Sequence, residues 1–129
     1  MITSADVVRA LRGCERVTTY LKPDKNGNLP IYQIVSPDAN AYPHMAVFET
    51  SRSSSFYSDD VPTTDEIGFR INLYSLENNL HEISRAVRDC LRDAGFDNVN
   101  IGTDGWSIPL GLYTKTVSCS TWEEVEGEE

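Results

Sequence analysis

The stretch from Asp65 to Phe96 constrains the fold most strongly, because two apolar periodicities follow one another there almost without a break. In its first half, apolar residues alternate with other residues, as in a strand that is buried on one face: Ile67, Phe69, Ile71 and Leu73. After Ser75 the spacing changes to steps of three and four, which places the apolar residues on one stripe of a helix: Leu76, Leu80, Ile83, Val87, Leu91 and Ala94. Neither apolar surface can be buried alone, so we expect the helix to fold back onto the sheet.

Chain length and charge narrow the possible classes of protein. The 129 residues are enough for one domain with its own core. The formal net charge of −9 opposes the phosphate contacts that dominate nucleic-acid affinity, so we expect no specific nucleic-acid binding. No apolar run approaches the roughly 20 residues that cross a membrane. We therefore expect no membrane association. The N-terminal residues also lack the basic and apolar regions of a secretory signal, so we do not expect export by that route.

Acidic residues gather at the C-terminus of the chain. Five of the last seven residues are glutamates. Like charges in a short segment repel one another and remain solvated. We therefore expect a single α+β domain over residues 1–122, followed by an acidic, flexible tail over residues 123–129.

The remaining segments have weaker patterns. Thr3 or Ser4 can cap a short helix that ends at Gly13, and Gly95 is placed to end the long helix. Residues rich in β-branched and aromatic side chains predict further strands over residues 17–21, 31–35, 45–49 and 113–121.

The connections complete the expected fold. The first two of these strands would form a hairpin with a loose connection. Residues 51–65 have neither periodicity and predict a long loop, whereas residues 97–111 predict a mostly irregular connection. The fold class that we expect is α+β, with a mainly antiparallel sheet of about four or five strands and two helices packed on one face.

The three cysteines, Cys14, Cys90 and Cys119, are odd in number and far apart in the sequence. They form no Cys-x-x-Cys pair, and no histidine stands at ligand spacing. The pattern favours reduced thiols over a disulfide or a metal site.

Catalytic signatures are missing from the sequence. It has no glycine-rich phosphate loop and no Gly-x-Ser-x-Gly motif. His44 and His81 stand alone, and each is more typical of a surface or capping residue than of a general base. We therefore expect no enzyme activity, no cofactor and no catalytic residues.

One acidic cluster lies inside the fold and consists of Asp59, Asp60, Asp65 and Glu66. Its oxygens could hold a calcium ion, but the spacing fits no recognised cation loop, and a solvated acidic loop is the favoured interpretation. We therefore predict no metal site.

Two other groups of residues indicate a protein contact. Arg85, Arg88 and Arg92 recur along the long helix at steps of three and four and could form an interface strip. The helix pattern by itself favours a solvated face with Glu82–Arg85 and Arg85–Asp89 pairs. Several aromatic residues also lie outside the apolar stripes and mark a contact if they are exposed: Tyr20, Tyr32, Phe56, Tyr57, Trp106 and Trp122.

The order of features resembles a known family. Tyr42-Pro43 precedes Val47-Phe48-Glu49, and a polar loop leads to the segment from Glu66 to Ser75. The periodic helix, Gly95-Phe96 and a late Leu112-Tyr113-Thr114-Lys115 follow. This arrangement looks like the tail-completion, or tail-terminator, proteins of long-tailed bacteriophages and prophages. The resemblance covers residues 42–120 well and the N-terminal helix loosely, whereas residues 17–35 and the acidic tail have no counterpart in it.

The resemblance implies a structural virion protein that forms a ring, typically hexameric, on the end of the tail tube. Such a ring stops tube growth and offers a surface to the head-side connector protein. The implied partners are copies of the chain, the major tail tube protein and the connector. The implied location is the head–tail junction of the virion, and the host cytoplasm during assembly.

Closed rings need two different patches on each subunit. The candidate subunit interface takes residues from the loop and from the long helix: Arg52, Phe56, Tyr57, Asp59, Asp60, Arg85, Arg88 and Arg92. Two alternatives stay open: another neck or head-closure adaptor of the phage, and, from a different class, a small cytosolic domain that binds a regulatory ligand.

Overall fold

The structure is a computed structural model that describes the backbone of residues 2–34, 42–58 and 61–124, and the side chains of these residues except 54–58, 61–63 and 124. Its helices are α1 (Ser4–Arg12), α2 (Glu15–Thr18) and α3 (Leu80–Asp93). Its strands are β1 (Ile31–Gln33), β2 (His44–Ser58), β3 (Val61–Ser75), β4 (Asp97–Ile101), β5 (Gly105–Ser107) and β6 (Leu112–Glu124).

The strands form one mixed sheet in the order β1-β2-β3-β6-β4, and β5 pairs with β6 outside this path. Only the β1–β2 pair is parallel among the described strand pairs. The α+β class and the mostly antiparallel sheet are therefore confirmed. The expected counts were too low, because the described residues form six strands and three helices.

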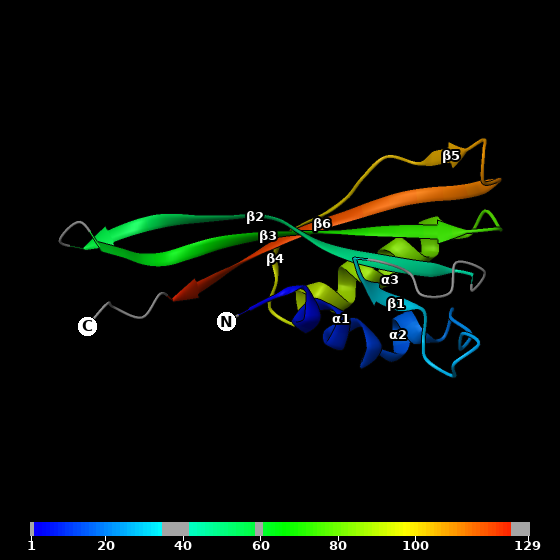
Figure 1. Cartoon of the computed structure of the whole chain (residues 1–129), viewed down its shortest axis with the longest axis horizontal. Helices are drawn as coiled ribbons and strands as arrows, with labels where there is room; N and C mark the ends of the chain where they lie inside the picture. The colour runs from blue at the N-terminus through cyan, green and yellow to red at the C-terminus, as the bar shows by residue number, and fades with distance from the viewer. Residues whose placement is uncertain (1, 35–41, 59–60, 125–129) are drawn as a thin grey trace.

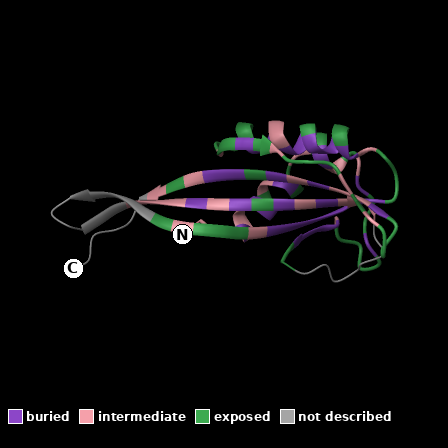
Figure 2. Ribbon diagram, turned by 90° about the horizontal axis from the view of Figure 1, so that it is seen from above, coloured by how far each residue is buried: buried purple, intermediate pink, exposed green. Residues whose placement is uncertain are grey.

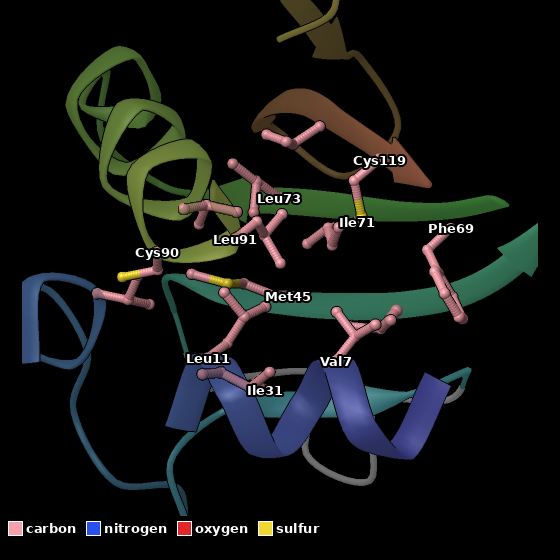
Figure 3. Packing of buried hydrophobic residues seen from close by; sticks show 14 of the residues in the cluster. Val7, Leu11, Ile31, Met45, Phe69, Ile71, Leu73, Cys90, Leu91 and Cys119 are labelled. Atoms are coloured by element: carbon pink, nitrogen blue, oxygen red, sulfur yellow. The ribbon is translucent and has the colours of Figure 1, made fainter. Parts of the chain in front are cut away.

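The core lies between the sheet and the helices (Figure 1). Buried and exposed residues alternate along the strands (Figure 2), so that one face of the sheet supplies most of the core. Figure 3 shows Val7 and Leu11 of α1 pointing toward Met45 of β2, and Leu91 of α3 lying near Leu73 of β3. No helix among the described residues is long and apolar enough to span a membrane.

The interpretation of Asp65–Phe96 as a strand followed by a core helix is confirmed by β3 and α3. Leu76 is an exception, since it precedes the helix and is exposed. The predicted end of the helix is also confirmed. Gly95 has a φ of 95°, its N–H donates to the carbonyl of Arg92, and the N–H of Phe96 donates to that of Leu91. These two bonds define a Schellman motif, which satisfies carbonyl groups at the helix end.

The predicted N-terminal helix is confirmed as α1. The N–H of Thr3 donates to Oδ2 of Asp6 at 2.8 Å, before the first turn. This hydrogen bond, together with the nearby guanidinium of Arg9, lowers the pKa of the Asp6 carboxyl group. The negative charge of Asp6 is therefore favoured at the positive end of the helix dipole.

The predicted strand over residues 17–21 was wrong, and with it the N-terminal hairpin. Residues 15–18 form α2, and Val17 is fully buried in the core. Burial against α3 outweighs the local strand preference of the Val-Thr-Thr sequence. The predicted strand over residues 31–35 is found as β1, but it pairs in parallel with β2, and Val35 lies outside the described residues.

The expectation of three reduced thiols was also wrong. A disulfide joins Cys14, between α1 and α2, to Cys90 of α3. The two cysteines are 76 positions apart, so only the packing of the N-terminal helices on α3 brings them together. Cys119 is free, and burial raises the pKa of its thiol to about 12.

The predicted connection over residues 97–111 contains two short strands, β4 and β5, and is less irregular than expected. The predicted strand over residues 113–121 is confirmed, and β6 extends beyond it at both ends. Glu123 and Glu124 belong to this strand, whereas residues 125–129 lie outside the described residues.

Candidate functional site

The predicted loop over residues 51–65 was wrong, because residues 51–58 and 61–65 continue β2 and β3 as a long antiparallel pair. We call the distal part of this pair, residues 50–58 and 61–66, the arm. The two strands stay paired from Ser51 opposite Gly68 to Ser58 opposite Val61. Register shifts after Glu49 and on either side of Phe56 interrupt the alternation, which explains why the sequence shows no strand period. The arm projects past the helices (Figure 1).

A cluster of charges fixes the base of the arm. Arg52 donates hydrogen bonds to Glu49 at 3.0 and 3.2 Å, to Glu123 at 3.0 Å and to the carbonyl of Ile2 at 2.6 Å. The hydrogen bonds to Glu49 are the main cause of the raised pKa of the Arg52 guanidinium. The N–H of Ile2 also donates to Glu123. Burial opposes ionisation of Glu123, but these hydrogen bonds outweigh it and lower the pKa of the carboxyl group.

Arg52 therefore connects the arm to β6 and to the start of the chain. Its side chain is only 24% exposed, so most of its surface is already used within the subunit. Of the other arm candidates, Phe56 and Tyr57 lie in β2 and only their backbone is described. Asp59 and Asp60 lie outside the described residues.

The predicted arginine strip lies on α3. Arg85 and Arg92 are exposed, whereas Arg88 is partly buried and pairs with Asp89 at 3.2 Å. The solvated-face interpretation paired Asp89 with Arg85, whereas the structure pairs Asp89 with Arg88. Arg85 lines an open groove of about 420 Å³ between α2 and α3, with Arg16 and Tyr20 among the other lining residues.

The described residues of the arm lie away from α3 within one subunit (Figure 1). The arm leaves one end of the sheet, while α3 packs under β3, β4 and β6 (Figure 1). The structure thus separates the two halves of the candidate interface, and a second subunit would be needed to join them.

An exposed apolar surface lies at the opposite end of the sheet from the arm. We call it the apolar end, and it consists of Leu76, Trp106, Ile108 and Leu110, which are 59%, 54%, 83% and 66% exposed. The pairing of Ser75 with Tyr113 brings Leu76 to the end where β6 begins. Sequence periodicity does not identify this surface, because its residues belong to turns and to the short strand β5.

The aromatic candidates have different environments. Trp106 packs edge-on against Tyr113 with ring centroids 4.8 Å apart, and Trp122, near the base of the arm, is 40% exposed. Tyr32, in contrast, is buried and donates a hydrogen bond to Asp24 at 2.8 Å. This bond is the main cause of the lowered pKa of Asp24.

His44 was predicted to lie at the surface and is instead buried. Its ring lies 4.9 Å from those of Tyr42 and Tyr74. His44 is therefore packed among aromatic rings inside the protein. The other histidine, His81, is exposed as expected.

Lys115 was not identified from the sequence. It is only 6% exposed, and its Nζ donates to Asp104. The hydrogen bond from Lys115 is the main cause of the lowered pKa of Asp104. A buried ammonium with one carboxylate partner is typical of a structural ion pair.

Metal and ligand sites were sought in the part of the chain that the structure describes. No group of three or more histidine, cysteine or acidic residues is close enough there to hold a metal ion. A groove of about 500 Å³ is open to solvent and runs between α1 and β1, lined by Ala5, Val8, Arg9, Arg12, Ile31, Tyr32 and Gln33.

Comparison with known proteins adds no relative. The chain matches no protein-family model, and a search of curated proteins found no match.

Proposed function

We propose that this chain is a structural bacteriophage protein that caps the tail tube as a ring and joins the tail to the head-side connector. In this proposal it is not an enzyme. Its partners are other copies of the chain, the tail tube protein and the connector protein. The proposed location is the head–tail junction. The proposal rests on the family resemblance of residues 42–120 and on the arm.

The arm is the observation that best supports a role in assembly. A two-stranded ribbon is only marginally stable by itself in water. β6 accompanies β3 as far as Thr64, and beyond it β2 and β3 continue as two strands through the pairs Tyr57–Pro62 and Ser58–Val61. This chain thus extends β2 and β3 past the helices (Figure 1). Such an extension is useful when a neighbouring molecule covers it.

The distribution of surfaces also fits a ring. A closed ring needs a heterologous interface, in which one patch of a subunit contacts a different patch of the next. The arm and the exposed arginines Arg85 and Arg92 lie on different parts of the subunit. The apolar end is a third surface, and we assign it to the contact with the tube or the connector, because exposed apolar patches of this kind mark protein interfaces.

The proposal is tested by measuring assembly with the tail tube protein encoded by the same genome. Sedimentation velocity should show self-association of the chain or co-sedimentation with the tube protein. The double substitution Arg85→Glu and Arg92→Glu should weaken ring formation, whereas Arg9→Glu, on the exposed face of α1, serves as a charge control. A chain that neither self-associates nor binds tube or connector subunits would refute the proposal.

A regulatory ligand-binding domain is the second candidate, and the groove beside α1 is the observation in its favour. Arg9 and Arg12 line this groove and could bind an anionic ligand. A thermal-shift screen of anionic metabolites tests it, because a ligand that binds only the folded state raises the melting temperature. A ligand-induced shift that Arg9→Ala abolishes, without any assembly, would favour this candidate.

A further inference from the structure

The position of α2 depends on the Cys14–Cys90 disulfide. The helix has four residues, of which Val17 is fully buried. A helix of one turn is not stable by itself, so tertiary contacts must hold it in place. Arg16 pairs with Asp93 of α3 at 2.8 Å, but the two side chains are 56% and 64% exposed, and solvent weakens such a pair. The covalent bond is therefore the strongest link between α2 and α3.

The preceding helix, α1, is held more firmly. It contributes three buried apolar side chains to the core: Val7, Val8 and Leu11. Cys14 follows α1 directly after Gly13, so the docked α1 keeps Cys14 beside α3 whether or not the bond is present. Cys90 lies on the side of α3 that faces the N-terminal helices (Figure 3). The two sulfur atoms therefore remain neighbours after the bond opens.

The three cysteines differ in how easily a small molecule reaches them. Cys14 is partly exposed, whereas Cys90 and Cys119 are each only 4% exposed. Thiol–disulfide exchange requires a thiolate to approach one sulfur of the bond, so access decides which sulfur reacts. An incoming thiolate can therefore reach Cys14 more easily than Cys90.

We propose that the Cys14–Cys90 bond is a reversible redox latch between α2 and α3, and that Cys14 is the site at which low-molecular-weight thiols and disulfides open and close it. The closed latch is the disulfide, and the open latch is a pair of neighbouring thiols. Reducing surroundings favour the open latch and oxidising surroundings the closed one.

Glutathione illustrates the chemistry and serves as the probe. To close the latch, the Cys14 thiolate attacks one sulfur of oxidised glutathione, which forms a mixed disulfide and expels one glutathione thiolate. The Cys90 sulfur, as it loses its proton, then attacks the Cys14 sulfur and expels the second glutathione. The protein loses two electrons and two protons, and oxidised glutathione gains both to become two molecules of reduced glutathione. Opening is the reverse sequence.

The latch ties together the two walls of the groove between α2 and α3. Cys14 immediately precedes α2, which supplies Arg16 to one wall, and Cys90 follows Asp89 of the other wall. Opening the latch frees the α2 wall while α3 stays in the core. The redox state thus controls the shape of the groove that Arg85 lines. The latch does not depend on the proposed function, and its failure would leave tube binding untouched.

Alkylation under native conditions tests the opening of the latch in the wild-type chain. The full chain would be incubated with reduced or oxidised glutathione, treated with iodoacetamide and analysed by mass spectrometry. Excess reduced glutathione should make Cys14 reactive, and excess oxidised glutathione should make it unreactive again. Cys119 is the internal control, because it is buried in the core and reacts only when the whole domain unfolds. It should stay unmodified throughout.

Single substitutions test which sulfur exchanges. Cys90→Ser should keep one glutathione on Cys14 when it is treated with oxidised glutathione, because the second attack cannot occur. Cys14→Ser, the matched control, should acquire glutathione on Cys90 at least about tenfold more slowly because Cys90 is buried. The wild-type experiment needs no variant, so it decides the proposal even if one of these chains fails to fold.

Amide hydrogen exchange tests the release of α2. The N–H groups of Thr18 and Thr19 donate to the carbonyls of Cys14 and Glu15 and report on this turn. Reduction should accelerate their exchange at least about tenfold more than that of Leu11 in α1.

Three results would overturn the proposal. The first is a bond that reduced glutathione opens only when Cys119 also reacts, which would mean that opening requires unfolding. The second is exchange at Cys90 as fast as at Cys14. The third is equal acceleration of amide exchange in α1 and α2.

Discussion

Removal of the Cys14–Cys90 disulfide should destabilise the protein strongly, and the magnitude follows from the length of chain that it closes. The cysteines are 76 positions apart. For a loop of that length, the chain-entropy relation gives about 15 cal/mol/K, or about 4.5 kcal/mol at 25 °C. Native disulfides in small domains contribute about 2–5 kcal/mol when removed. At this chain length, the loss corresponds to a decrease in melting temperature of about 10–20 °C.

The perturbation is best made in two ways. The double substitution Cys14→Ala and Cys90→Ala removes the bond together with the packing of the sulfur atoms. Reduction of the wild-type chain removes only the bond. Thermal unfolding followed by circular dichroism should show a large decrease for both, and the reductant should leave the double variant unchanged.

Counting the free thiols gives the result that would refute the predicted disulfide. Alkylation of the denatured, unreduced chain should modify Cys119 alone, and prior reduction should expose all three cysteines. If all three are alkylated without reduction, the Cys14–Cys90 bond is absent, and if reduction leaves the melting temperature unchanged, the bond does not contribute the predicted stability.

Two further predictions concern the core and the acid response. Phe69→Ala should cost about 3–5 kcal/mol in chemical denaturation because Phe69 is 1% exposed and packs edge-on against Phe96. The control, Leu76→Ala, should change the free energy of unfolding by less than about 0.5 kcal/mol because Leu76 is exposed. Equal losses of unfolding free energy in the two variants would contradict the packing of Phe69 in the core. The lowered pKa values of Asp24 and Asp104 contribute stability above the unfolded pKa near 3.8, and this stability is lost as the pH falls through their folded values. The melting temperature should therefore fall between pH 5 and pH 3, less steeply in Asp24→Asn; an identical slope would show that Asp24 does not contribute.

The strongest periodic segment was predicted correctly because its signal is local. The alternation around Phe69 and the three- and four-residue steps around Val87 each express one face of an element that is buried on that face alone. The Gly95 helix end was predictable for the same reason, since the motif involves only consecutive residues.

The errors arose where distant parts of the chain decide local structure. Val17 belongs to a sequence that prefers strand, but its burial beside α3 makes a helical turn the better solution. Cys14 and Cys90 become partners only after the N-terminal helices dock. Neither fact is encoded in a short window of sequence.

The arm was missed for another reason. β-Bulges insert unpaired residues, so the period of two is broken around Thr50 and Phe56 although the hairpin continues. Arg52, a candidate interface residue, lies in this segment, and its partners Glu49 and Glu123 come from its own chain. The apolar end could not be predicted from periodicity, because Ile108 and Leu110 lie in a turn.

Electron microscopy of polymerised tail tubes tests the central claim most directly. Tubes assembled from the tail tube protein of the same genome, with and without this chain, would be imaged and their ends compared. We expect a ring at one end of each tube, and shorter tubes as more of the chain is added. Tubes of unchanged length with bare ends would contradict the assignment of this protein as a tail-tube cap.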